Sequence, residues 1–347
     1  MARAVAAAPL IRATEGAATL PGMRILVTGG AGYVGSASVE ELVGHGHEVV
    51  VLDNFATATR GADLAGAALV EGTYGDRDVM HRLLADKGIE AVLHCAARSL
   101  VPESVREPAL YYTENVGGGI ALLEAMRLAG VERLVISSTA AVYGDPDVVP
   151  IPEDAPLRPI NTYGETKRTL ETAAGWYAQA YGLRPIALRY FNVAGASQRN
   201  GERHDPETHL IPNLLTAVER GEPFTLTGVD YPTPDGTTIR DYLHVVDLAE
   251  AHRLALDLTR DRSGGDGLLA LNLGSGRGFG VREVIAAAER VVGRPIDVRE
   301  APRRGGDPPA LVAKIDQARE VLGWEPRRST LDQMVGSAWA ERRARTA

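Results

Sequence analysis

Cysteine is scarce in this sequence, which holds one such residue, Cys95, among 347. A lone thiol excludes an intrachain disulfide and a zinc site built from several thiolates, and we expect no metal site. Because Cys95 follows His94 at the end of an apolar run, we expect a buried, unreactive thiol. So little cysteine fits the reducing cytoplasm, which we expect to be the location of the protein.

Long hydrophobic runs are also missing. The sequence holds no stretch of about 18 consecutive apolar residues, the length that a membrane-spanning helix needs. Residues 1–22 are rich in alanine but lack the basic start and long apolar stretch of a secretory signal. We therefore expect a disordered leader over residues 1–22 and no membrane partner.

Positive charge is in deficit. Lys and Arg number 37 against 45 Asp and Glu, which gives a formal net charge of −8. This balance argues against a nucleic acid or an anionic membrane as a partner. Any phosphate-bearing ligand must therefore be met by positive charge that is concentrated locally.

The most informative stretch runs from residue 24 to residue 54. It reads as an apolar run, a glycine-rich turn, a helical segment, a second apolar run and an acid. Gly30, Gly32 and Gly35 match the G-x-G-x-x-G pattern of a dinucleotide-binding turn, whose pyrophosphate lies at the N-terminus of the helix. A carboxylate at Asp53 would bond a ribose 2′-OH and repel a 2′-phosphate, so we expect NAD rather than NADP.

Apolar runs and helical patterns alternate through the first half of the chain. We predict strands at 24–28, 48–52, 68–71, 91–95, 133–137 and 185–190. Helices are predicted at 35–45, 78–87, 117–129, 164–181, 209–220, 246–258, 281–292 and 330–343. This alternation predicts an α/β protein with a Rossmann-type doubly wound parallel sheet that is covered by helices on both faces.

Beyond about residue 190 prolines break the sequence into shorter elements. We expect an NAD-binding Rossmann domain over 23–190. A smaller C-terminal α/β substrate-binding domain should occupy 191–347, with some segments interleaved with the first domain.

A tyrosine and a lysine four residues apart, Tyr163 and Lys167, open the helix predicted at 164–181. This spacing places both on one helix face. A nearby ammonium and a positive nicotinamide ring both favour phenolate, which could take the proton of an alcohol as hydride leaves the same carbon. The hydroxyls of Ser137, Ser138 and Thr139 end the preceding apolar run, where they could bond the substrate oxygen.

These motifs resemble those of the extended short-chain dehydrogenase/reductase superfamily. More of the chain, from about residue 24 to residue 324, is similar to one family within it, the UDP-glucose (UDP-galactose) 4-epimerases. The block from residue 230 to residue 248 is the most specific part of the similarity. The other stretches that carry it are 27–35, 94–97, 188–192, 209–212, 272–276 and 303–307.

The resemblance implies roles for individual residues. Tyr163 would be the base, Lys167 would hold the nicotinamide ribose and Thr139 would bond the 4-OH of the sugar. The residues implied to contact NAD are Gly29, Gly32, Tyr33, Val34, Gly35, Asp53, Asn54, Asp76, Arg77, Ala96, Ala97, Lys167 and Phe191. Those implied to contact a UDP-sugar are Thr139, Tyr163, Asn192, Leu210, Arg240, Tyr242, Arg304 and Asp307.

The implied reaction is an epimerisation of a UDP-hexose, UDP-galactose to UDP-glucose. Hydride leaves C4 of the sugar for NAD, the 4-keto sugar turns over in the pocket, and hydride returns to the opposite face. The resemblance also implies a homodimer. Arg240 and Arg304 would supply the local positive charge that an acidic protein must place against a pyrophosphate.

Several positions depart from the commonest pattern of this family. Thr139 replaces a serine but keeps the hydroxyl. Ser99 stands where some members have a lysine, and Glu114 replaces an asparagine near the cofactor. Thr227 stands where an aromatic ring often faces uracil, and Leu311 lies near the position associated with acceptance of N-acetylated sugars.

The same residues bear on three other functions. A sugar-nucleotide dehydratase would carry Asp-Glu after the hydroxyl, where this chain has Ala140 and Ala141, whose methyl groups transfer no proton. A 4-epimerase for UDP-xylose/UDP-arabinose or UDP-GlcNAc/UDP-GalNAc stays open. A non-catalytic NAD-binding protein would be expected to have lost Tyr163, Lys167 or the hydroxyl, and all three are present.

Overall fold

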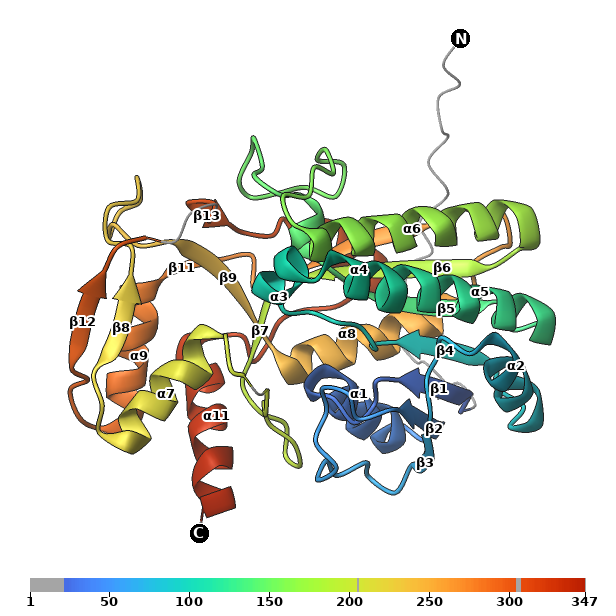
Figure 1. The fold of residues 1–347 in the computed structure, drawn as a ribbon, viewed down its shortest axis with the longest axis horizontal. Helices are drawn as coiled ribbons and strands as arrows, with labels where there is room; N and C mark the ends of the chain where they lie inside the picture. Colours follow the sequence, from blue (N-terminus) through green and yellow to red (C-terminus); the bar gives the residue numbers. More distant parts are fainter. Residues whose placement is uncertain (1–21, 205, 304–306, 347) are drawn as a thin grey trace.

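The computed structural model describes residues 22–204, 206–303 and 307–346. Its larger part is a seven-stranded sheet with the order β10-β6-β5-β4-β1-β2-β3, in which every neighbouring pair is parallel (Figure 1). The strands are β1 (Arg24–Thr28), β2 (Glu48–Asp53), β3 (Ala68–Glu71), β4 (Ala91–His94), β5 (Arg133–Thr139), β6 (Arg184–Tyr190) and β10 (Leu269–Leu273). The predicted α/β class and doubly wound sheet are confirmed.

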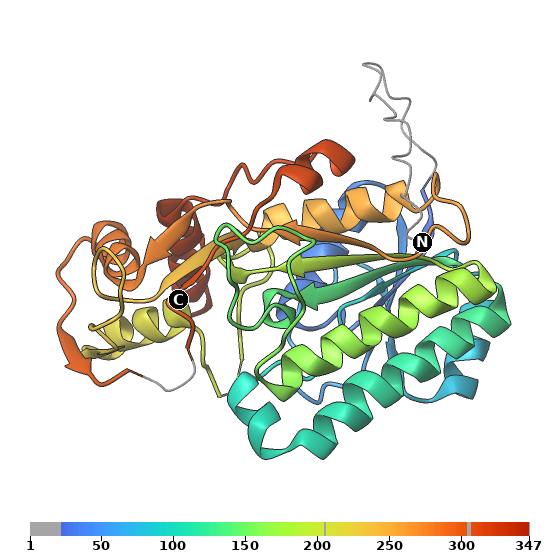
Figure 2. The same cartoon turned by 90° about the horizontal axis from the view of Figure 1, so that it is seen from above.

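Helices cover both faces of this sheet (Figure 2). One face carries α2 (Arg77–Asp86), α5 (Gly118–Ala129) and α6 (Thr162–Tyr181), and the other carries α1 (Tyr33–Gly44), α8 (Val245–Leu258) and α10 (Asp316–Leu322). Side chains of β1 alternate between the two layers, because successive residues of a strand point to opposite faces. Ile25 and Val27 pack in one core and Leu26 in the other, so the middle of the strand is apolar on both faces.

Helix boundaries follow local chemistry. Asn161 begins α6 by accepting a hydrogen bond from the backbone N–H of Gly164 at 2.9 Å. Gly182 ends the same helix in a left-handed conformation, with φ of 79°, which a residue with a Cβ adopts only with strain. The helix predicted from residue 117 has an irregular start, since η1 (Tyr112–Gly117) forms a π-helical turn directly before α5. Two short helices, α3 (Val101–Arg106) and α4 (Pro108–Tyr111), precede it.

The smaller part of the molecule contains two further sheets. Strands β7 (Asn192–Ala194), β9 (Ile239–His244), β11 (Gly278–Gly280) and β13 (Ala310–Leu311) form one, and β8 (Phe224–Thr227) pairs with β12 (Val298–Ala301). Helices α7 (Leu210–Arg220), α9 (Val281–Val292) and α11 (Leu331–Thr346) pack around them (Figure 1).

Strand β10 is the main element that the sequence analysis missed. It lies well beyond residue 190, yet it pairs with β6 as an edge strand of the large sheet. The chain therefore returns to the first sheet after it has begun the smaller part. The division at residue 190 stays a prediction, and the expected leader at 1–22 lies almost entirely outside the described residues.

Within the described part of the chain, no helix is both long enough and apolar enough to span a membrane.

Candidate active site

A cavity of about 1490 Å³ lies between the carboxyl edge of the large sheet and the smaller part of the molecule. Its wall includes residues that follow β1, β2, β4, β5 and β6, together with residues from β9 and α7. Ligands of doubly wound proteins bind at this edge. Because single-ligand pockets are roughly 300–1,000 Å³, this cavity has room for two ligands side by side.

The glycine turn forms one end of the cavity. Gly29 adopts φ of 69°, and a Cβ there would lie 2.7 Å from the Cα of Ala96 on the next strand's extension. A Cβ on Gly35 would strike the backbone oxygen of Gly29 and lie 2.8 Å from the Cα of Gly30. Because a Cβ would clash at either position, Gly29 and Gly35 present only backbone atoms at the start of α1.

The first turn of α1 suits an anion. Gly32 caps the helix without a side-chain bond, and the first turn carries no acidic residue. The first N–H groups of a helix have no partners within it, and Gly32, Tyr33 and Val34 line this end of the cavity. The cradle therefore fits the pyrophosphate of a dinucleotide.

Asp53 ends β2 beside this turn. Its side chain is buried, and its two oxygens accept hydrogen bonds from the N–H groups of Ala31 at 3.0 Å and Phe55 at 2.8 Å. These bonds fix the carboxylate, and each oxygen keeps a second lone pair for a ribose hydroxyl. Asn54 lines the cavity next to it.

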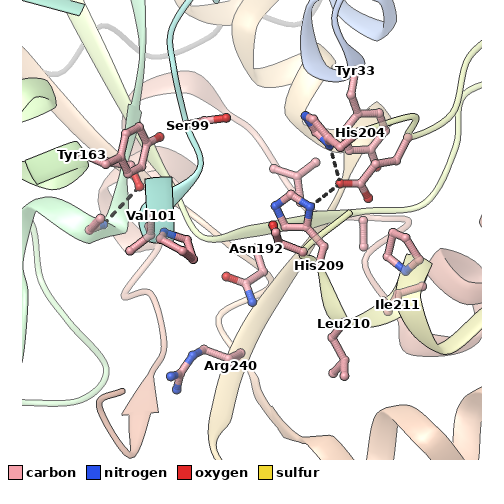
Figure 3. A pocket seen from close by; sticks show the side chains of 18 of the residues that line it. Tyr33, Ser99, Val101, Tyr163, Asn192, His204, His209, Leu210, Ile211 and Arg240 are labelled. Carbon is pink, nitrogen blue, oxygen red and sulfur yellow. Dashed lines mark hydrogen bonds and ion pairs between the residues drawn. The ribbon is translucent and has the colours of Figure 1, made fainter. Parts of the chain in front are cut away.

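Thr139, Tyr163 and Lys167 line another part of the cavity wall. Figure 3 shows Tyr163 across the cavity from Tyr33. Thr139 lies at the end of β5, and Tyr163 and Lys167 lie on one face of α6, as the spacing predicts. Burial raises the pKa of Tyr163 to about 12, and a hydrogen bond with Thr139 opposes that shift. The phenol is therefore protonated near neutral pH in this structure.

Lys167 is buried and donates a hydrogen bond to the backbone oxygen of Ser137 at 2.8 Å. Burial lowers the pKa of its ammonium to about 8, against opposing contributions from Cys95 and Glu171. The pKa shift of Tyr163 comes from burial and from Thr139, without a contribution from the Lys167 ammonium. The lowering of the tyrosine pKa that a nearby ammonium was expected to cause is therefore not seen in this structure.

A buried ion pair beneath these residues escaped the sequence analysis. Glu171 continues the helix face of Tyr163 and Lys167, pairs with Arg189 on β6 at 2.6 Å and accepts a hydrogen bond from Ser138. Both partners are buried, so this pair ties α6 to β5 and β6. The sequence signal for Glu171 was its spacing, since it is the third residue of an i, i+4, i+8 series that begins with Tyr163 and Lys167.

The residues implied for the nucleotide part of the substrate line the other half of the cavity. They are Asn192, Leu210, Arg240, Tyr242 and Asp307. The guanidinium of Arg240 lies 3.5 Å from Asp307 and also donates to the backbone oxygens of Ile239 and Pro308 at 2.8 and 2.9 Å. Burial lowers the pKa of Arg240, while Asp307 opposes the shift.

Figure 3 shows Tyr163 and Tyr33 on opposite sides of the cavity, with Asn192 and Arg240 between Tyr163 and Leu210 in this view. The remaining cofactor candidates Ala96, Ala97 and Phe191 also line it. So do the positions that depart from the family pattern: Ser99, Glu114, Thr227 and Leu311.

Two of the described candidate residues, Asp76 and Arg77, do not line the cavity. Asp76 caps α2 by accepting from the N–H groups of Asp78 and Val79, and Arg77 pairs with Asp78 at 2.8 Å. The NAD contacts that the resemblance implies for Asp76 and Arg77 therefore stay predictions. Arg304 lies outside the described residues.

Cys95 also lines the cavity, so it is less buried than the sequence analysis expected. Burial raises the pKa of its thiol to about 11, and a high thiol pKa agrees with the expected lack of reactivity.

The profile of the NAD dependent epimerase/dehydratase family matches residues 25–274. The chain belongs to this family. This match confirms the resemblance predicted from the sequence. It also confirms the prediction that the protein uses NAD.

Proteins named UDP-glucose 4-epimerase are similar over most of this chain. The one from Streptomyces lividans is 51% identical over 318 residues, which is 91% of this chain and 95% of that protein. The crystal structure of the Brucella ovis protein in complex with NAD is 44% identical, with a TM-score of 0.87 over 92% of this chain and 98% of that chain. The Bifidobacterium longum structure in complex with NAD+ and UDP is 34% identical, with a TM-score of 0.85 over 92% and 99%.

Proposed function

We propose that this protein catalyses the NAD-dependent 4-epimerisation of a UDP-hexose, interconverting UDP-galactose and UDP-glucose. One observation carries the proposal: the glycine turn, the Tyr163–Lys167–Thr139 group and Arg240 all line a single cavity. The names and bound ligands of the similar proteins support it. When bound, NAD supplies the hydride acceptor and donor and, in its oxidised form, a positive charge that favours phenolate.

Tyr163 moves the proton of the sugar C4 hydroxyl. Burial raises the pKa of this phenol to about 12, and the positive charge of bound NAD would lower it and so favour its action as a base. Its hydrogen bond with Thr139 keeps a second hydroxyl at the same point. Thr139 then orients the sugar oxygen, and its methyl group does not prevent this.

Lys167 holds the cofactor side of the site. Its ammonium has three donors, and the bond to Ser137 oxygen uses one of them and fixes the side chain. A ribose hydroxyl is a suitable partner for another donor. The ion pair of Glu171 and Arg189 keeps α6, and with it Tyr163 and Lys167, in register with β5 and β6.

The nucleotide end of the substrate is held on the other side of the cavity. Arg240 offers a guanidinium to the diphosphate, and its bonds to two backbone oxygens pre-orient it. Asn192, Leu210, Tyr242 and Asp307 complete this wall, and Arg304 is assigned to the same end from the sequence. Firm binding of UDP leaves the sugar free to present either face at C4.

The direct test is to incubate the purified protein with UDP-galactose and no added cofactor, and to follow UDP-glucose by chromatography. We expect UDP-glucose to form without net reduction of NAD, and heat denaturation to release NAD from the protein. Release of NAD without turnover of UDP-galactose would reject this substrate and direct the same assay to UDP-arabinose/UDP-xylose and the N-acetyl sugars. Absence of both would reject the proposed function.

We also propose that the protein is a cytoplasmic homodimer that serves galactose metabolism. Support for a dimer comes from large apolar side chains exposed on neighbouring helices: Trp176 (66%) and Tyr181 (53%) on α6 and Leu128 (47%) on α5. Light scattering on the purified protein tests the dimer, and Trp176→Glu should shift the mass toward that of one chain. The cytoplasmic location is supported by a free cysteine and is tested by cell fractionation.

A further inference from the structure

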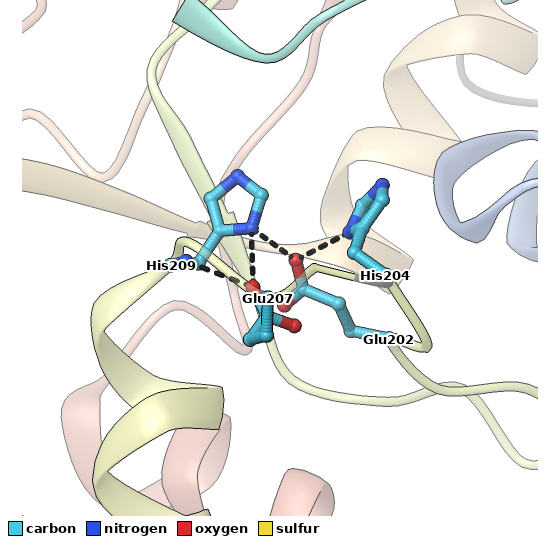
Figure 4. A group of neighbouring side chains, drawn as sticks. All are labelled: Glu202, His204, Glu207 and His209. Carbon is cyan, nitrogen blue, oxygen red and sulfur yellow. Dashed lines mark hydrogen bonds and ion pairs between the residues drawn. The ribbon is translucent and has the colours of Figure 1, made fainter. Parts of the chain in front are cut away.

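Two Glu-x-His pairs lie in the segment that joins β7 to α7: Glu202 with His204, and Glu207 with His209. Figure 4 shows the four side chains converging from both sides of this segment. One donor atom from each of the four lies within 4.8 Å of the other three. None of these residues has a place in the function proposed above.

The distances suit a small cation. One carboxylate oxygen of Glu202 lies 3.0 Å from Nδ1 of His204 and 2.6 Å from Nδ1 of His209. An oxygen of Glu207 lies 2.9 Å from the same nitrogen of His209. In a tetrahedral zinc site, with metal–ligand bonds of about 2.1 Å, ligand atoms lie roughly 3.4 Å apart. Outward shifts of less than about 1 Å would therefore admit an ion at the centre.

The donors are held in place by their neighbours. The ring of Tyr33 packs edge-on against His204, and its hydroxyl is fixed by a 2.7 Å hydrogen bond to Gly195 oxygen. An oxygen of Glu207 accepts from the N–H groups of Thr208 and His209 at 2.8 Å each. Such outer contacts orient metal ligands and favour a defined geometry.

Charge in the cluster calls for a cation. The side chain of Glu202 is 7% exposed and that of Glu207 is 18% exposed, so two carboxylates lie close together away from water. The adjacent Arg203 does not neutralise them, because its guanidinium bonds Gly61 oxygen and Glu341. The imidazole nitrogens of His204 and His209 face the Glu202 carboxylate at 3.0 and 2.6 Å, and a metal ion at the centre would be held by these same atoms.

We propose that Glu202, His204, Glu207 and His209 bind a divalent transition-metal ion, most naturally zinc. Two imidazole nitrogens and two carboxylate oxygens are a zinc donor set, whereas magnesium and calcium prefer oxygen ligands alone. The expectation of no metal site rested on the single cysteine, which bears only on sites built from thiolates. This inference does not rest on the proposed function.

The position of the cluster indicates a structural role. Glu202, His204 and His209 form part of the cavity wall near Tyr33 at the start of α1. The same segment reaches Asp63 through Arg199 and Asn200 and reaches α11 through Arg203. An ion would therefore hold in place the segment that joins β7 to α7, and it should raise the thermal stability of the whole protein.

The test is zinc binding by the full chain. After treatment with a chelator, the protein is titrated with Zn²⁺ in competition with a chromophoric chelator, and bound zinc is counted by atomic spectrometry. We expect about one zinc ion per chain, with excess Mg²⁺ or Ca²⁺ failing to compete. Co²⁺ should give the strong visible absorption of a tetrahedral site.

Variants assign the site to these residues. His204→Gln and Glu202→Gln should each weaken zinc binding by roughly 10²-fold and abolish the zinc-dependent rise in Tm. The matched control His81→Gln lies on α2, far from the cluster, and should bind zinc like the unchanged chain. If His204→Gln does not fold, Glu207→Gln serves, since its amide oxygen still accepts from the two N–H groups.

Three results would overturn the proposal. They are the absence of stoichiometric zinc on the unchanged chain, equal losses in His81→Gln and the cluster variants, and displacement of zinc by Mg²⁺ at similar concentration.

Discussion

The two ends of the cavity present different groups to a ligand, backbone at one end and side chains at the other. At the cofactor end the ligand-facing surface is mostly backbone: the glycine turn and the first turn of α1, with Asp53 fixed by two N–H groups. At the nucleotide end it is mostly side chain, with Arg240 held by backbone oxygens and by Asp307. A backbone surface tolerates no added atom, whereas a side-chain surface can be weakened in steps.

This difference suits the proposed reaction. The dinucleotide has to stay in place through both hydride transfers, and a rigid cradle of glycines provides that. The sugar has to turn over while UDP is held, so the pocket needs strong contacts at the nucleotide and few at the sugar.

Gly35→Ala should give the largest effect. A Cβ at this position strikes the backbone oxygen of Gly29, which cannot move without opening the turn. We expect loss of bound NAD and a fall of about 3 kcal/mol or more in the free energy of unfolding, measured by urea titration. Gly44→Ala is the matched control, since it lies in the same helix with open space around it and should be neutral or slightly stabilising. Equal effects of the two changes would contradict a rigid cradle.

Tyr163→Phe should lower kcat by roughly 10²-fold or more, because the proton of the C4 hydroxyl loses its acceptor. Bound NAD, measured after denaturation, should stay the same as in the unchanged protein. Tyr177→Phe is the control on the same helix, since its hydroxyl bonds Glu124 and does not line the cavity. Unchanged turnover in Tyr163→Phe would remove this residue from the mechanism.

Arg240→Ala should raise KM for UDP-galactose by roughly 10- to 100-fold with a smaller change in kcat, since the hydrogen bonds of a charged group are worth about 1.5–3 kcal/mol. Arg240→Lys should recover part of the loss, because the charge returns without the planar fork. Arg277→Ala, an exposed position on the neighbouring strand connection, should leave KM unchanged. A pure loss of kcat in Arg240→Ala would show that this end does not grip the nucleotide.

Asp53→Asn should reduce the preference for NAD over NADP by roughly tenfold, since the amide removes the charge that repels a 2′-phosphate and keeps one acceptor oxygen. Affinities of both dinucleotides for the emptied protein, measured by calorimetry, check this. A ratio equal to that of the unchanged protein would reject the assignment of Asp53.

Lys167 should leave a smaller mark on the pH dependence of stability. Burial lowers its pKa to about 8 in the folded chain, below its usual value of 10.5. Between these two values the unfolded chain binds a proton that the folded chain does not, so stability rises with pH across this window. Relative to Lys167→Met, the unchanged protein should therefore gain stability from pH 8 to pH 10.5. A flat difference in urea titrations across this range would contradict a buried ammonium.

The comparison of the two ends also explains what the sequence could predict. Elements with strong local signals, such as the glycine turn and the capped α6, lie where the pattern placed them. Strand β10 was missed because its partner β6 is distant in the chain, and pairing between distant segments leaves no local signal. The same reason hid the pair of Glu171 and Arg189, which three-dimensional packing brings together.

The ligand-binding candidates divide in the same way. Those that follow strands of the large sheet reach the cavity because the carboxyl ends of parallel strands share one edge. Asp76 and Arg77 do not, since local capping and an adjacent acid engage their side chains. The cluster around His209 was missed because Glu-x-His pairs are common in exposed loops, and their convergence appears only in the folded segment.

The central claim is that one cavity keeps both the cofactor and the oxidised sugar until hydride returns to C4. UDP-galactose that carries deuterium at C4 tests it most directly, in ordinary water and without added NAD. We predict UDP-glucose that retains the deuterium at C4, measured by mass spectrometry and NMR. Loss of the label to solvent, or a requirement for added cofactor, would contradict the claim.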